Sequence, residues 1–185
     1  MSSPSEVLIG NPEMVNRLPY TYAVLKETLR LYPPANGMRE GLPGVFIRDK
    51  HGPSFPAEGF HIWVVHTAVQ RNPSSLTRPH DFIPDRWLVD PGHPLYPPAG
   101  GWRPFEHGPR NFIGQNISLM AVKATLALVV RQFDFHDAYA EYDAIHPLKK
   151  NEINTLFNER AFMIQKGVVH PAQGFPCKVT LCDAK

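Results

Sequence analysis

The apolar segment IGQNISLMAVKATLALVVRQF, which begins at Ile113, constrains the fold more than any other part of this chain of 185 residues. Its apolar spacing predicts a helix over 113–131. Apolar side chains recur on almost every face of that helix, a pattern typical of a buried helix rather than of a half-exposed one. Other elements must therefore cover it, and any apolar face left bare favours association with a second molecule.

A second helix is predicted in YTYAVLKETLRLY, which follows Pro19 and stops before Pro33 and Pro34. Leu25 and Leu29 are spaced to share one face of this helix. The prolines on either side fix where the helix begins and ends, because proline suits a first turn but cannot continue a helix.

Short β-rich runs bounded by glycine or proline predict strands. They lie at 45–48, 60–65, 133–135, 160–165 and 176–181. A loop-rich stretch from Asn72 to Gly108 precedes the apolar helix. Helices and strands do not alternate regularly, so we expect an α+β fold with small sheets and one long loop. The length fits a single domain over 1–185.

Charge and hydropathy exclude two classes of partner. There are 19 basic and 17 acidic residues, a formal net charge of +2, and no run of like charges, which argues against nucleic-acid binding. The N-terminal segment is polar, and no segment has the uninterrupted apolar length of a membrane span. We therefore expect a cytoplasmic protein that binds no nucleic acid and crosses no membrane.

Three short motifs occur in a fixed order. Glu27 and Arg30 lie one helical turn apart in KETLR, where a carboxylate and a guanidinium can pair. The run FIPDRW supplies Arg86, and FEHGPRNFIG at 105–114 then leads into the apolar helix. Each motif alone is weak evidence, but the three together are specific.

In this order, and with RLYPP directly after the first, the motifs resemble the ExxR helix, the PERF-like meander and the haem-binding loop FxxGxRxCxG of cytochromes P450, especially fungal ones. The resemblance implies a C-terminal P450 fragment, with helices of the K and L type and a long meander loop. It also implies that Glu27, Arg30 and Arg86 form the family's buried structural triad.

Phe112 departs from this family pattern, because it stands where the haem-binding loop carries its cysteine. A phenyl ring has no lone pair for iron, and the family's oxygen chemistry depends on the thiolate. The family's upstream helices, which cover the haem, also lie outside the matching region. We therefore expect a truncated, haem-free protein without a cofactor, in which the Phe112 ring fills part of the space that haem would take.

The sequence leaves more than one role open for other polar residues near this loop. By the resemblance, Arg39 and Arg110 match positions that contact haem propionates; without haem they either hold a substrate carboxylate or carbonyl or are solvated. His107 precedes the tight turn at Gly108 and is badly placed to replace the lost ligand. The scattered histidines, His66 among them, lack metal-ligand spacing, so they predict surface or loop positions and no metal site.

The leading hypothesis is a non-redox cyclase or isomerase of secondary metabolism that acts on an apolar terpenoid or polyketide. An intramolecular Diels–Alder reaction forming a norbornene-type ring is a concrete example, since holding the reacting ends together lowers the barrier. The candidate catalytic residues are Arg39, His107 and Arg110, which could polarise a carbonyl. The predicted substrate-binding residues are Met38, Trp102, Phe105, Phe112 and Ile113.

Two alternatives remain open. One is a non-catalytic binding or regulatory module for a redox partner or another P450, with Arg103 and Arg110 facing that partner. The other is an inert P450 remnant that does not fold alone. In either case an uncovered helix at 113–131 predicts a homo-oligomer.

Overall fold

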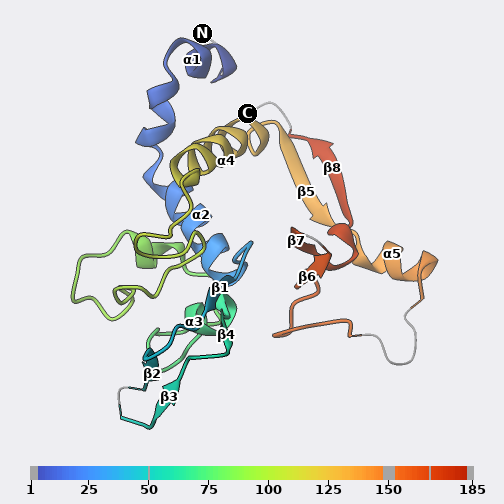
Figure 1. Cartoon of the computed structure of the whole chain (residues 1–185). Coiled ribbons are helices and arrows are strands. Elements are labelled where there is room, and N and C mark those ends of the chain that lie inside the picture. Colours follow the sequence, from blue (N-terminus) through green and yellow to red (C-terminus); the bar gives the residue numbers. More distant parts are fainter. Residues whose placement is uncertain (1–3, 50, 148–152, 167, 183–185) are drawn as a thin grey trace.

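The computed structural model describes residues 4–49, 51–147, 153–166 and 168–182 (Figure 1). Helices and short strands are mixed along the chain, and the predicted α+β class is confirmed. The helices are α1 (Pro4–Gly10), α2 (Pro19–Leu31), α3 (His66–Gln70), α4 (Gln115–Val129) and α5 (Tyr139–Ile145), with 3-10 turns η1 (Pro12–Arg17), η2 (Pro84–Trp87) and η3 (Ala172–Gly174).

The strands form antiparallel pairs rather than one large sheet. The pairs are β1 (Gly37–Glu40) with β4 (His61–Val64), β2 (Phe46–Arg48) with β3 (Ser54–Pro56), β5 (Phe133–Asp137) with β8 (Cys177–Leu181), and β6 (Met163–Lys166) with β7 (Val168–Pro171). Figure 1 shows β2 and β3 at one end of the molecule and β5 and β8 extending to the side. The five predicted strands correspond to β2, β4, β5, β6 and β8.

Helix α2 lies at the centre and positions the rest. Its first residue is Pro19. An N–H group in the first turn of a helix has no acceptor within that helix, so proline, which lacks the N–H, is well tolerated there. The helix ends at Leu31, just before Pro33. It packs against η2, α3 and α4. Its inward face buries Leu25 and Leu31 together with the charged side chains of Glu27 and Arg30. The centre of the molecule is therefore held by polar contacts as well as by apolar packing.

Helix α4 is only partly covered by other elements. Among its residues, Leu119 and Lys123 are buried, whereas Ile117 is 75% exposed. Ile113, just before the helix, is fully exposed. The cause is that α1, η1 and α2 pack along part of α4 and leave the rest of its apolar surface open. The helix thus has the apolar composition typical of a buried helix, and the uncovered apolar surface expected from the sequence is present. Every helix among the described residues is too short or too polar to cross a bilayer.

Candidate active site

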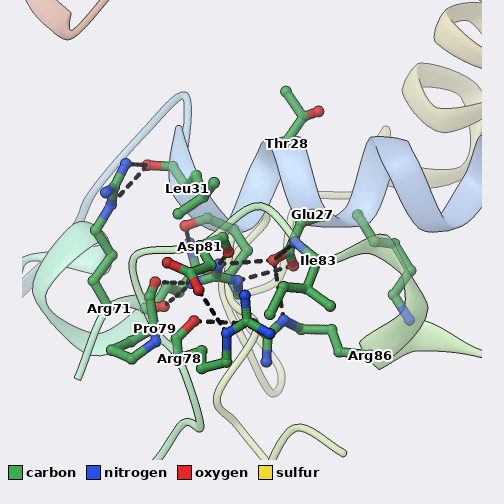
Figure 2. Close-up of polar contacts among 12 residues, drawn as sticks. Glu27, Thr28, Leu31, Arg71, Arg78, Pro79, Asp81, Ile83 and Arg86 are labelled. Atoms are coloured by element: carbon green, nitrogen blue, oxygen red, sulfur yellow. Dashed lines mark hydrogen bonds and ion pairs between the residues drawn. The ribbon is translucent and has the colours of Figure 1, made fainter. Parts of the chain in front are cut away.

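A buried ion-pair network anchors α2 to the long loop (Figure 2). The Glu27 carboxylate accepts hydrogen bonds from Arg30 Nε (2.9 Å) and Nη2 (2.8 Å) and from Arg86 Nε (3.0 Å). It also accepts from Trp87 Nε1 and from the backbone N–H of Ile83, both at 2.9 Å. The side chains of Glu27, Arg30 and Arg86 are fully buried.

The charge state of Glu27 follows from these contacts. Burial alone would raise the pKa of Glu27, but the hydrogen bonds from Arg30 and from the Ile83 N–H, together with the charges of Arg30 and Arg86, hold it below its usual value. Glu27 is therefore a carboxylate between two guanidinium groups. The structure thus brings the three residues of the predicted triad into direct contact.

The guanidinium groups also donate to backbone carbonyls of the loop and of the last residue of α3. Arg30 donates to the carbonyl oxygens of Gln70, Pro79 and Asp81 at 2.6 to 2.9 Å. Arg86 donates to the carbonyl of Arg78 at 3.2 Å, within the same loop. Figure 2 shows the loop residues Arg78, Pro79 and Asp81 gathered close to the Arg86 side chain. These hydrogen bonds hold the long loop, which has little regular structure, against α2.

A pocket of about 720 Å³ opens between α2, α4 and the FEHGPRNFIG loop. Its apolar wall is made by side chains of all three elements. They include Leu25, Leu29, Phe105, Phe112, Ile113 and Leu119. A few polar groups face the same space, among them Asn36, His66, Glu106 and Arg110. A mainly apolar cavity with a few polar groups is typical of a small-molecule site.

Phe112 forms part of the pocket wall. Its ring lies nearly parallel to that of Phe105, with centroids 6.2 Å apart and planes at 10°. The Phe112 N–H donates to the Phe105 carbonyl at 2.9 Å, which closes the loop. The ring also lies over Gly114, where a Cβ would come within 2.7 Å of the ring carbon Cζ. Gly114 is thus needed for the close approach of this aromatic ring.

Glu106 is a polar group of the pocket with several hydrogen-bond and ion-pair partners. Its carboxylate accepts from Arg103 Nη2 (2.9 Å), faces His66 Nε2 (3.0 Å) and lies 3.5 Å from Arg39 Nη2. The backbone N–H of His107 also donates to it, at 3.3 Å. Burial would raise the pKa of Glu106, but the hydrogen bonds from Arg103, His66 and the His107 N–H outweigh it and hold the pKa below its usual value.

His66 lies in the pocket wall and is 1% exposed, so the prediction of a surface or loop histidine is wrong for this residue. Its Nδ1 is 2.8 Å from the carbonyl oxygen of Ala35, and its Nε2 faces Glu106. Its backbone N–H donates to Asn36 Oδ1 at 3.0 Å. Both ring nitrogens therefore face oxygen atoms, one of the Ala35 carbonyl and one of the Glu106 carboxylate.

The three candidate catalytic residues lie in different surroundings. Arg110 lines the pocket, and no hydrogen bond or ion pair joins its side chain to another described residue. Arg39 lies on β1 beside Glu106 and does not line the pocket. His107 is exposed and outside the pocket wall. Arg110 is thus the one of the three that faces the cavity.

The predicted substrate-binding residues are also divided. Phe105, Phe112 and Ile113 line the pocket. Met38 is exposed on β1 and lies outside it. The Trp102 indole packs edge-on against Phe105 and donates its Nε1–H to the carbonyl of Lys26 at 2.9 Å, away from the cavity. His66 and Glu106 are pocket residues that the sequence reasoning missed, because their contact joins positions 40 residues apart.

The side chains around Phe112 do not fit a haem bound in the P450 manner. Phe112 has no donor for iron. His66 is the pocket-lining imidazole among the described residues, and both of its ring nitrogens are already engaged. Arg39, expected to contact a haem propionate, is paired with the protein's own Glu106. The described part of the chain therefore presents no thiolate and no free imidazole to this space.

Comparison with known proteins identifies relatives of the whole chain. The monooxygenase polC of Polytolypa hystricis is 40% identical over 185 residues, which are 100% of this chain and 33% of polC. The monooxygenase PC-23 of Penicillium crustosum is 32% identical over 175 residues, covering 93% of this chain and 81% of PC-23. The chain thus spans about a third of the length of polC but most of that of PC-23.

The fold and the family profile agree with these relatives. The structure of a retinoic acid-bound cyanobacterial CYP120A1 superimposes with a TM-score of 0.67 at 21% identity, over 92% of this chain and 34% of that one. The sequence profile of the family described as cytochrome P450 matches residues 9–157, which include α2, the long loop and α4. The chain therefore belongs to the cytochrome P450 family.

Proposed function

We propose that this chain is a haem-free P450-family protein that binds an apolar small molecule and converts it without redox chemistry. The observation that carries the proposal is the apolar pocket of about 720 Å³, which has Phe112 in its wall and is also lined by Arg110, whose side chain no other described residue engages in a hydrogen bond or ion pair. The names of the fungal relatives as monooxygenases support a small-molecule substrate. A terpenoid or polyketide of secondary metabolism fits the size and apolar lining of the pocket.

The proposed chemistry is a cyclisation or isomerisation, for example an intramolecular Diels–Alder reaction that forms a norbornene-type ring. Such a reaction transfers no electron to or from the protein. Folding a flexible substrate so that its reacting ends meet supplies much of the rate increase. A hydrogen bond from Arg110 to a substrate carbonyl would stabilise the charge that develops in the transition state. Arg39 would act only indirectly, through Glu106, and His107 would have no direct part.

The test uses the purified chain and an enone tethered to a cyclopentadiene, whose intramolecular Diels–Alder reaction forms a norbornene-type ring. Ring formation and product stereochemistry are followed by chiral chromatography against a buffer control. We expect faster closure and one dominant stereoisomer with the wild-type protein, and about a 100-fold slower reaction with Arg110→Ala. Arg131→Ala removes an exposed arginine outside the pocket and should react like wild type. A wild-type rate and isomer ratio equal to buffer would refute the proposal.

A non-catalytic binding module is the second candidate, and the exposed Ile113 and Ile117 beside the pocket favour it. The same apolar surface supports the proposal of a homo-oligomer. Of the two arginines proposed to face a partner, Arg103 is paired with Glu106, which leaves Arg110. An inert remnant would lack a cooperative fold, so a single sharp thermal unfolding transition would count against it.

A further inference from the structure

One carboxylate at the polar end of the pocket lies among two guanidinium groups and an imidazole. Glu106 is 13% exposed and lies within 3.5 Å of nitrogen atoms of Arg39, Arg103 and His66. The two guanidinium groups outnumber the single carboxylate, so the cluster keeps a net positive charge next to an apolar cavity. This is the charge pattern of an anion-binding site.

The backbone of Glu106 supports the same interpretation. Its backbone φ angle is +68°, in the left-handed region that residues other than glycine and asparagine rarely adopt. Such a conformation persists when the surrounding contacts over-determine it. Its Oε1 atom also lies over Gly37, where a Cβ would be 1.6 Å away. Gly37 thus leaves a space that a carboxylate oxygen fills.

We propose that Arg39, Arg103 and His66 form a carboxylate-binding seat, and that Glu106 is an internal occupant which the carboxylate of an apolar acid replaces. This rests on the proposed function, because the apolar part of that acid would lie in the same pocket, along Leu25 and Phe105. Exchange of one carboxylate for another leaves the charge of the seat unchanged. The Glu106 side chain is 13% exposed and the next residue, His107, is exposed, so the displaced carboxylate has a path to solvent. The ligand class is therefore an apolar monocarboxylic acid.

The seat is tested by calorimetric titration of wild type and Glu106→Gly with dodecanoate and dodecan-1-ol. Glycine suits the positive φ at position 106, which offsets part of the stability that is lost with the carboxylate. We expect dodecanoate to bind the variant at least about tenfold more tightly than wild type, since it meets unpaired cations, and dodecan-1-ol to be unchanged. In the double variant Gly37→Ala/Glu106→Gly the added methyl group fills the oxygen position, and the gain should disappear. An equal gain for the alcohol would overturn the proposal.

Acetate separates this proposal from the proposed function, because it reaches the seat without needing the apolar pocket. We expect sodium acetate, compared with sodium chloride at equal concentration, to raise the melting temperature of Glu106→Gly but not that of the double variant. If acetate does so while neither long-chain ligand binds, the seat stands and the apolar pocket proposal fails. If neither acetate nor dodecanoate distinguishes Glu106→Gly from wild type, the seat is refuted.

Discussion

Glu27 lies between two buried guanidinium groups. It joins Arg30 and Arg86, and all three side chains are excluded from solvent. Removing one member of such a group leaves the other charges buried without compensation. The role of these residues is therefore expected to be stability rather than chemistry.

We predict that Glu27→Gln lowers the free energy of unfolding by about 3 to 5 kcal/mol, because two buried guanidinium groups lose their counter-ion. Urea titration followed by circular dichroism measures the change. Glu58→Gln, at an exposed position, is the matched control and should stay within about 0.5 kcal/mol of wild type. A Glu27→Gln protein as stable as the control would show that the network is not the anchor of α2.

The contribution of Glu106 should depend on pH. Its pKa is held below the usual value in the folded state, against about 4.3 in the unfolded chain. The stability that it contributes is therefore complete above the unfolded pKa and is lost as the pH falls through the folded pKa. We predict that Glu106→Gln costs about 1 to 3 kcal/mol at pH 7 and that this difference shrinks below about pH 4. Urea titrations of both proteins from pH 7 to pH 3 measure it; a constant difference would contradict the ionised state of Glu106.

At the scale of elements, local patterns predicted the segments whose boundaries are set by nearby residues. Prolines bracket α2, and Gly44 and Gly59 lie just before β2 and β4, so these elements were predicted within one or two residues. Helix α5 was missed because its 7 residues are too few for a helical period to show in the sequence. Strands β1 and β7 were missed because their strand character depends on pairing with β4 and β6, which short sequence runs do not reveal.

The exposed apolar surface of α4 should govern self-association. We predict that the mass of the wild-type protein, measured by light scattering, rises with concentration, and that Ile113→Asp/Ile117→Asp shifts it to the monomer without lowering the melting temperature. The reason is that both side chains are largely exposed, so aspartate there disrupts an intermolecular contact rather than internal packing.

Ile145→Asp is the matched control for that experiment, since Ile145 is an exposed isoleucine on another helix, α5. It should associate as wild type does. A wild-type protein that is monomeric at every concentration would contradict the role given to α4.

At the scale of the whole molecule, the sequence motifs predicted where the site lies but not which residues contact one another in it. Arg110 and Phe112 were found because both lie in one contiguous motif. Glu106 lies in that motif too, but its role in the site depends on contacts with Arg39 and His66, which belong to other elements. Long-range contacts of this kind follow from the fold and leave no local signal. The pocket and its polar end are therefore results of the structure.

The P450 family membership and the character of the pocket lead to one central expectation, that this protein does not hold haem through a thiolate. The most direct measurement is an absorption spectrum of the purified chain after incubation with haem, reduction with dithionite and addition of carbon monoxide. We predict that the red-shifted Soret band of a thiolate-bound ferrous carbonyl complex does not form, because Phe112 stands in the place of the ligand. The appearance of that band would contradict a haem-free function.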